Sequence, residues 1–251
     1  MSASSDSAMR THITPRWLRL AQLAWLVILA FTLVFLTVGL PVRFAAMSQP
    51  CLESADDCRL MDYLIPEQAA RLEALGISLE TYARIDLIWF LFTTLVTAAI
   101  GLLIFWKRSN DWLALLVSAY LVFPPAGMGN HIASAYPAWS TAADIVFNLG
   151  NILMFLFFAF FPNGRFAPRW MRWYWLAMIT LSILPSELDF LWVVGWLSFL
   201  TLGPYSQIYR YLKTSNAIER MQTKWVVYGF SMFAAALLIG ILLQEINLLP
   251  D

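Results

Sequence analysis

The chain has 251 residues and no net charge at neutral pH; 60% of its residues are hydrophobic and only 13% are charged. A soluble domain carries roughly 25% charged and 45–50% apolar residues. The composition therefore excludes a soluble domain, a disordered chain, a disulfide-rich miniprotein and a collagen-like array. It predicts an all-α integral membrane protein with several spans.

Seven apolar segments approach the length of about 20 helical residues that a bilayer core requires. They are Trp17–Leu40, Ile85–Trp106, Trp112–Asn130, Thr141–Phe161, Trp170–Ser186, Leu188–Tyr209 and Trp225–Gln244. Pro124 and Pro125 predict a kink or an early end within the third segment. The fifth and sixth segments form one apolar stretch, in which we predict a tight outer hairpin at Glu187–Asp189.

The basic residues predict the orientation. With seven spans and a cytoplasmic N-terminus, twelve of the 16 Lys and Arg residues lie inside and four lie outside. Such an excess of Lys and Arg is typical of cytoplasmic loops. The predicted organisation is a cytoplasmic tail (1–16), a first transmembrane helix (17–40), an extracytoplasmic loop domain (41–84), a six-helix transmembrane bundle (85–246) and an outer C-terminal tail (247–251).

The outer loop contains the two cysteines of the chain, Cys51 and Cys58. Because the outside of a cell is oxidising, we predict a disulfide between them. Closing so short a loop would contribute roughly 2–3 kcal/mol by chain-entropy reasoning. A two-thiolate metal site is the alternative, but it needs further ligands and this loop contains no histidine.

A short helix is predicted after the cysteine pair, because Pro66 suits a first helical position and Gly76 a C-terminal stop. Ser78 then suits the N-cap of the helix that enters the second span. Eight acidic and four basic residues between Pro41 and Asp86 give this region a net charge of −4. Two roles fit the loop equally well: a helical cap on the membrane surface, or a sensory lid that contacts a ligand.

The spans contain few ionisable residues, which argues against an ion or substrate pathway. Asp144 and Asn148 lie one helical turn apart, and His131 and Trp139 fall near the same outer ends. These four residues are the candidate ligand-facing group, although His131 is also typical of an interfacial side chain. No catalytic motif, metal motif or cofactor motif is present, so we expect a protein that is not an enzyme and has no cofactor.

Two predicted inner loops are basic and begin with turn or cap signals. Their motif residues are Pro162, Gly164, Arg165, Arg169, Asn216, Arg220, Lys224 and Trp225. Pro162 and Gly164 predict a turn, and Ser215 or Asn216 predicts the cap of a short helix. Basic residues hold such loops inside and touch lipid phosphates, and they can also dock a cytoplasmic partner.

Three motifs together resemble a known family. They are L-x-x-L-G-I-S-x-x-x-Y-A at Leu72–Ala83, F-P-N-G-R-F-x-P-R-W at Phe161–Trp170 and S-N-x-x-x-R-x-Q-x-K-W at Ser215–Trp225. With the cysteine-pair loop, they are similar to the N-terminal membrane domain of bacterial sensor histidine kinases, such as the competence peptide-pheromone receptor kinase. The resemblance covers nearly the whole chain, and it implies a multi-pass protein of the bacterial inner (plasma) membrane.

The chain departs from that family because it contains no phosphoacceptor motif and no nucleotide-binding motif. We therefore expect a sensory or receptor module without a catalytic domain, either free-standing or truncated. A small transporter or channel and a structural subunit of a membrane complex are the alternatives. The expected partners are the bilayer, a peptide or amphipathic small ligand outside, a cytoplasmic kinase or regulator, and a second copy in a homodimer; no nucleic acid is expected.

Overall fold

The computed structural model describes residues 14–51, 63–123, 127–184 and 189–245, and every regular element within them is a helix. The helices, in chain order, are α2 (Pro15–Met47), α4 (Pro66–Ala74), α5 (Leu79–Arg108), α6 (Trp112–Val122), α7 (Gly127–Ala135), the 3-10 helix η1 (Pro137–Trp139), α8 (Ser140–Phe160), α9 (Met171–Leu181), α10 (Asp189–Lys213) and α11 (Ala217–Glu245). The predicted all-α class is confirmed for this part of the chain.

Three helical segments among the described residues are long and apolar enough to cross a membrane. They are Arg16–Met47, Leu79–Arg108 and Pro137–Phe160. Side chains such as Val27 on α2 and Ile88 on α5 are two-thirds exposed, which suits contact with lipid rather than water. The chain is accordingly a membrane protein, and these segments match the first, second and fourth predicted spans.

Two other predicted spans differ from the structure. In the Trp112–Asn130 segment, α6 ends at Val122 and α7 begins at Gly127, in agreement with the predicted kink or early end. In the fifth segment, α9 has only 11 residues. An α-helix rises 1.5 Å per residue, so neither α6 nor α9 alone has the length of a bilayer core. Pro124, Pro125, Glu187 and the tail 247–251 lie outside the described residues. The number of seven spans and the orientation stay predictions.

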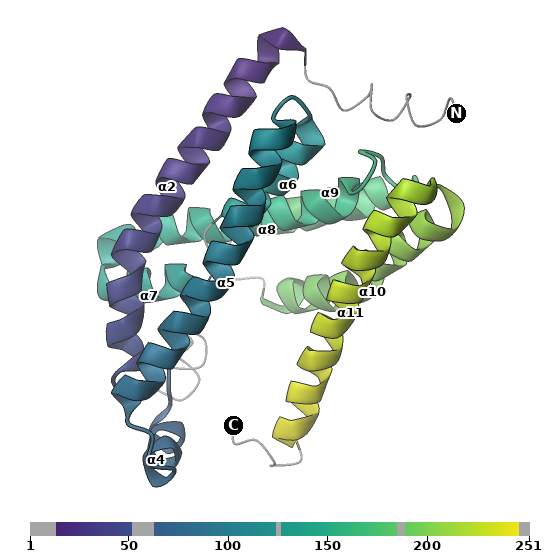
Figure 1. The fold of residues 1–251 in the computed structure, drawn as a ribbon. Coiled ribbons are helices and arrows are strands. Elements are labelled where there is room, and N and C mark those ends of the chain that lie inside the picture. Colours follow the sequence, from purple (N-terminus) through teal and green to yellow (C-terminus); the bar gives the residue numbers. More distant parts are fainter. Residues whose placement is uncertain (1–13, 52–62, 124–126, 185–188, 246–251) are drawn as a thin grey trace. The chain divides into compact units, whose positions relative to one another are not determined.

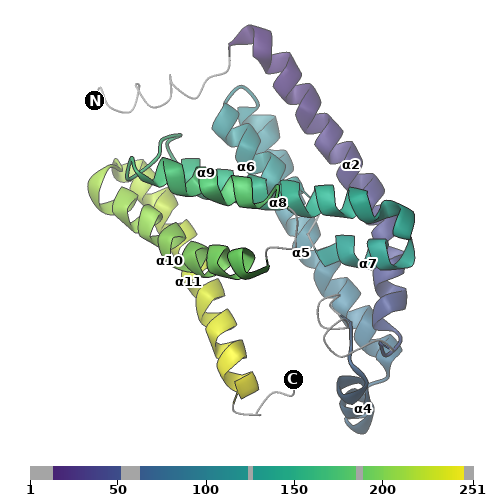
Figure 2. The same cartoon turned by 180° about the vertical axis from the view of Figure 1, so that it is seen from behind.

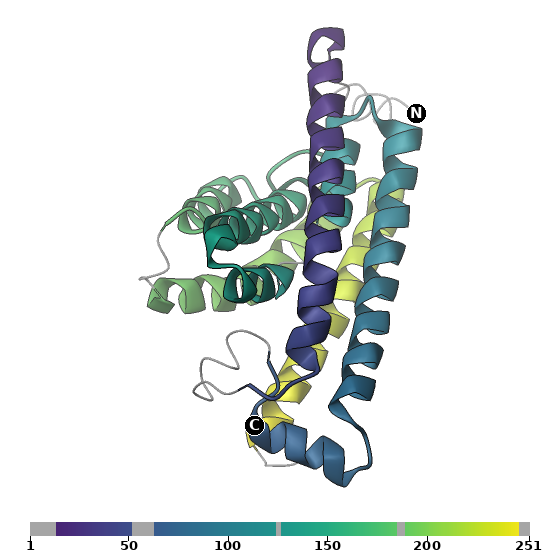
Figure 3. The same cartoon turned by 90° about the vertical axis from the view of Figure 1, so that its left-hand side faces the viewer.

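The described residues form two compact units. The first, which we call the hairpin unit, comprises residues 14–110 and 117–150. Its helices α2 and α5 lie side by side, and α7 packs against α2 (Figures 1 and 3). Gly39 on α2 permits the close approach of α7, because a Cβ atom there would lie 2.3 Å from the sulfur of Met128. Arg43 lies one helical turn further along α2.

A chain of polar contacts joins α2, α5 and α6 through side chains at Trp25 and Ser118. The indole N–H of Trp25 donates to Ser118 Oγ at 2.9 Å, and Ser118 donates to the carbonyl of Gly101 at 2.7 Å. The Trp25 ring also stacks on Phe105, with 3.9 Å between ring centroids. Polar contacts of this kind hold helices together where lipid removes the hydrophobic driving force.

The described end of the 41–84 loop follows its sequence signals. Pro66 is the first residue of α4, and Gly76 adopts φ +77°, a conformation that glycine adopts without steric cost. Ser78 caps α5 by accepting a hydrogen bond from the backbone N–H of Thr81 at 3.2 Å. The predicted short helix and the predicted cap are both confirmed.

The second unit, which we call the C-terminal unit, comprises the described residues of 111–116 and 151–245. In it, α11 lies along α10, and α9 also packs on α10 (Figure 2). Its core is a cluster of aromatic rings around Phe199, which contacts Phe155, Phe158 and Phe230 at centroid distances of 5.2–5.6 Å. Edge-to-face pairs such as these favour a fixed packing.

Candidate functional site

An ion pair that is largely shielded from solvent fastens the last turns of α2, which extends to Met47 and so beyond the predicted span end at Leu40, to the first turns of α5. Arg43 Nε and Nη2 donate to the two carboxylate oxygens of Asp86 at 2.8 and 2.9 Å. The side chains are only 10% and 20% exposed. The guanidinium also lies 5.0 Å from the centroid of the Phe90 ring, one turn beyond Asp86. Two parallel hydrogen bonds fix both distance and orientation, so this pair defines how the two helices meet.

His131 brings α7 into the same cluster. Its Nε2 lies 3.2 Å from Nη1 of Arg43, and its side chain is fully buried. Because a guanidinium can only donate, Nε2 must act as the acceptor. The contact therefore requires an imidazole whose Nε2 carries no proton. Arg43 thus links three helices, with a carboxylate on α5 and a neutral imidazole on α7.

Tyr63 connects the loop to this cluster. Its hydroxyl is 2.6 Å from Ser134 Oγ, and its ring meets the His131 ring edge-on, with 5.1 Å between centroids. Ser134 in turn donates to the carbonyl of His131 at 3.0 Å. One loop residue therefore touches α7 both at its surface and at its buried histidine.

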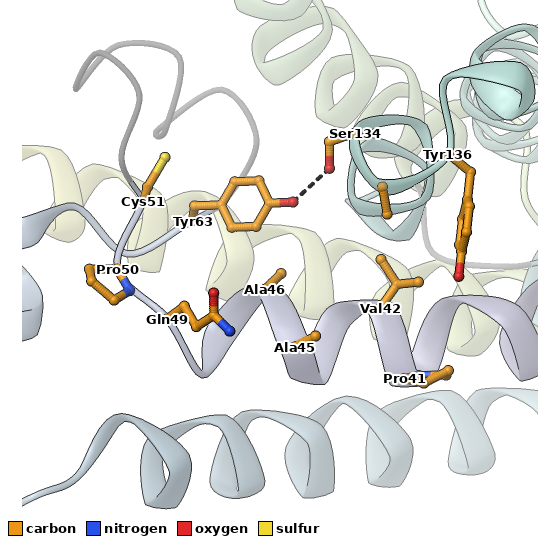
Figure 4. Close-up of a pocket in the computed structure, with 11 residues that line it drawn as sticks. Pro41, Val42, Ala45, Ala46, Gln49, Pro50, Cys51, Tyr63, Ser134 and Tyr136 are labelled. Carbon is orange, nitrogen blue, oxygen red and sulfur yellow. Dashed lines mark hydrogen bonds between the residues drawn. The ribbon is translucent and has the colours of Figure 1, made fainter.

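A cavity of about 590 Å³ lies beside Tyr63 (Figure 4). Its walls come from the last turns of α2, including Val42 and Ala46, from the adjoining Gln49 and Cys51, and from the end of α7 with Ser134 and Tyr136. Its volume falls within the range of small-molecule sites, and its wall combines small apolar side chains with hydroxyl and amide groups. A second cavity of about 260 Å³ is lined by Tyr63, Gln68, Tyr82 and the Arg43–Asp86 pair.

No family model, curated protein or solved structure matches the chain.

The candidate ligand-facing residues do not form one group around the larger cavity. His131 is buried in the polar cluster, whereas Trp139 lies on η1, and Asp144 and Asn148 lie on α8. The lining residues do not include Trp139, Asp144 or Asn148. Sequence reasoning singled out neither Asp86 nor Arg43 as a candidate site residue. The one available signal was an arginine and an aspartate at the loop-side ends of two adjacent spans.

The two predicted inner loops lie together in the C-terminal unit. Gly164 has φ +72° in the turn after α8, and its N–H donates to the carbonyl of Phe160 at 2.7 Å. Asn216 caps α11: its Oδ1 accepts from the N–H of Glu219 at 2.9 Å, and the Glu219 carboxylate accepts from the N–H of Asn216. The two loops also share one cavity, which contains Arg165 and Arg169. Of the two predicted cap residues, the structure uses Asn216.

A buried arginine, Arg210, fastens α10 to the end of α8. It donates to the backbone carbonyls of Ala159 and Phe161, and Gln207 donates to the carbonyl of Phe158 at 2.8 Å. Burial lowers the pKa of Arg210 to about 10, and the charge of Glu219 acts in the opposite direction. The guanidinium therefore stays charged at neutral pH. These donors satisfy carbonyls that the end of any α-helix leaves unpaired.

The remaining motif residues are exposed on the first turns of α11. Arg220 donates to the carbonyl of Ser215 at 3.1 Å, and Lys224 lies 5.9 Å from the centroid of the Tyr228 ring. The Trp225 side chain is 76% exposed. Of the two loop cysteines, Cys51 lines the larger cavity and Cys58 lies outside the described residues. The disulfide stays a prediction.

Proposed function

We propose that the protein is a membrane sensory or receptor module of a bacterial two-component-type signalling system. In this proposal the 41–84 loop faces the outside of the plasma membrane and the loops after α8 and α10 face the cytoplasm. The family resemblance at Leu72–Ala83, Phe161–Trp170 and Ser215–Trp225 supports the assignment. The module has no catalytic step of its own; it converts binding outside into a shift of helices.

The observation that carries the proposal is the continuous contact from Tyr63 to the Arg43–Asp86 pair. A ligand that displaces the Tyr63 ring removes its edge contact with His131 and its hydrogen bond to Ser134. His131 is held by Arg43, and Arg43 sets the packing of α2 against α5. A ligand shifts such an equilibrium only by its differential affinity for the two arrangements. The contacts of Tyr63, His131 and Arg43 are the ones that can differ between the two arrangements of the helices.

The cavity beside Tyr63 indicates the kind of ligand. It offers hydroxyls from Tyr63, Ser134 and Tyr136 among small apolar side chains, and no charged side chain lines it among the described residues. An amphipathic molecule suits this combination. The sequence from Pro41 to Asp86 carries a net charge of −4, which favours a cation over an anion. A cationic or amphipathic peptide, or a small amphipathic molecule, is the ligand class we propose.

The exposed face of α11 at Arg220, Lys224 and Trp225 is the surface that we propose for the cytoplasmic partner, a transmitter kinase or a regulator. Arginine and tryptophan are enriched among the residues that dominate binding interfaces. A homodimer of this chain fits the same proposal. Replacing Trp225 with alanine should abolish co-purification with a partner encoded beside this protein.

Thermal unfolding in detergent with a panel of cationic and amphipathic peptides tests the proposal. A ligand at a hundred times its dissociation constant raises the free energy of unfolding by about 2.7 kcal/mol. Ala46→Trp should fill the cavity and abolish that shift. Val34→Trp, at a half-exposed position of the same helix, is the matched control and should leave the shift intact. If no peptide stabilises the protein, the structural-subunit role becomes the better one.

A small transporter is the second candidate, because buried ionisable groups such as Arg43, Asp86 and His131 are also typical of substrate pathways. A flux assay in proteoliposomes separates the two functions. The receptor proposal expects ligand binding without net transport. Ligand uptake that Asp86→Asn abolishes would instead support the transporter.

A further inference from the structure

A cavity of about 440 Å³ lies in the C-terminal unit. The turn after α8 contributes Asn163, Arg165 and Arg169 to its wall, and the end of α10 contributes Tyr209 and Thr214. Two segments that are some forty residues apart in the sequence therefore build one recess. Arg210 holds these segments together through its contacts with Ala159 and Phe161.

The chemistry of this recess suits an anion with several oxygen atoms. Arg165 and Arg169 supply two exposed guanidinium groups, and Tyr209 supplies a hydroxyl donor. The Thr214 hydroxyl donates to the carbonyl of Arg210 at 3.4 Å, and it would have to turn from this long contact to donate to an anion. Asn163 also lines the recess, and its buried side-chain oxygen has no hydrogen-bond partner among the described residues. No carboxylate lines the recess within the described chain. Arginine forks match the geometry of phosphate oxygens.

The position along the chain places the recess at the depth of lipid headgroups. The turn begins directly after Phe160, where the membrane-length segment Pro137–Phe160 ends. Trp170 and Trp173, which follow the turn, are 51% and 62% exposed. Exposed tryptophans at a helix end are typical of the membrane–water interface. A phosphate at this level is within reach of both arginines.

We propose that the recess formed by Arg165, Arg169, Tyr209 and Thr214 binds a phosphate group, carried by an anionic phospholipid or free in the cytoplasm. The site is independent of the receptor function, because it shares no residue with the cavity beside Tyr63. Its occupant would bridge the turn after α8 and the end of α10. Occupancy would therefore stabilise the C-terminal unit.

The test uses the whole protein purified in a neutral detergent, with two probes. Phosphatidylglycerol in mixed micelles represents the lipid, with phosphatidylcholine as the comparator, and inorganic phosphate represents the free anion. Thermal unfolding and native mass spectrometry report stabilisation and bound molecules. We expect phosphatidylglycerol or inorganic phosphate, but not phosphatidylcholine, to stabilise and to remain bound. Whichever probe does so identifies the source.

The double variant Arg165→Gln/Arg169→Gln should weaken that binding by roughly fivefold for each arginine, and so by about 25-fold. Arg172→Gln is the matched control, because Arg172 is exposed nearby but does not line the recess, and it should bind like the parent. The double variant Arg165→Lys/Arg169→Lys keeps both positive charges but loses the paired N–H donors of the guanidinium groups, so its binding should weaken less. This variant also tests the proposal if the glutamine variant does not fold.

Two results would overturn the proposal. The first is that neither phosphatidylglycerol nor inorganic phosphate stabilises the parent protein. The second is binding that is unchanged in both double variants, or equally weakened in the Arg172→Gln control.

Discussion

Each unit contains a buried arginine, and the two guanidinium charges are compensated in different ways. Arg43 is neutralised by the carboxylate of Asp86 on another helix and also holds the imidazole of His131. Arg210 donates to two backbone carbonyls at the end of α8, with Glu219 as a charge that favours its protonated form. The first arginine links side chains, and the second completes a helix end.

The difference teaches where motion can occur. Backbone carbonyls at a helix end cannot leave without unwinding the helix, so Arg210 has one arrangement. A carboxylate and an imidazole are carried by side chains, and a small shift of α7 or of Tyr63 changes what Arg43 contacts. We therefore assign a structural role to Arg210 and a responsive role to Arg43. The following variants break or sharpen this contrast.

Asp86→Ala should have the largest effect on stability. It removes the charge partner of a buried guanidinium, a change that costs about 3–5 kcal/mol in proteins. Because Asp86 is 20% exposed, we expect about 3 kcal/mol, measured as the free energy of unfolding in mixed micelles. Glu80→Ala, in the exposed Glu80–Arg84 pair, is the control and should cost at most about 0.5 kcal/mol. If the two variants lose the same free energy of unfolding, the Arg43–Asp86 pair contributes no more to stability than an exposed surface pair.

Arg210→Lys should cost about 2 kcal/mol, because an ammonium group can reach one of the two carbonyls and leaves the other buried without a donor. The same unfolding measurement applies, with Lys213→Met on the exposed last turn of α10 as the control. The loss should leave ligand response unchanged. An altered response would mean that Arg210 is not merely structural.

Tyr63→Phe should cost about 1 kcal/mol through its hydrogen bond to Ser134. Tyr136→Phe alters the same cavity wall at a half-exposed tyrosine and should cost much less. If both variants unfold at the parent's temperature, the loop is not fastened to α7 through Tyr63.

Ser118→Ala should have a similarly small effect of about 1 kcal/mol, because it removes two interhelical hydrogen bonds that average about 0.6 kcal/mol each in membranes. The variant breaks the Trp25–Ser118–Gly101 chain, which shares no residue with the contacts of Arg43 or Arg210. Thr93→Ala, on an exposed part of α5, is the control. A loss above about 2 kcal/mol would show that this chain, rather than the ion pair, dominates the packing of α2 against α5.

Much of the helical architecture could be predicted from local signals. Pro66, Gly76, Ser78 and Asn216 each determine a helix start or stop through a contact within a few residues. Composition likewise marks the three membrane-length segments. The early end of α6 at Val122 also agrees with the kink or early end that Pro124 and Pro125 predict within the Trp112–Asn130 segment. The 11-residue length of α9 shows the limit, because the predicted span Trp170–Ser186 is apolar beyond the end of that helix.

The site could not be predicted in the same way. Arg43 is 43 residues from Asp86 and 88 from His131, and only the packing of α7 on α2 at Gly39 brings them together. The sequence also suggested a group of His131, Trp139, Asp144 and Asn148 from proximity along the chain. In the structure these residues have different surroundings: His131 is buried beside Arg43, whereas Asp144 is exposed on α8.

The distance between the far ends of α2 and α5 tests the central claim most directly. Spin labels at the exposed positions Arg19 and Lys107 report it by electron spin resonance in a lipid nanodisc. If the Arg43–Asp86 pair controls how these helices pack, Asp86→Asn and Tyr63→Phe should shift or broaden the distance distribution, and Glu80→Gln should not. Identical distributions in all four proteins would contradict the account.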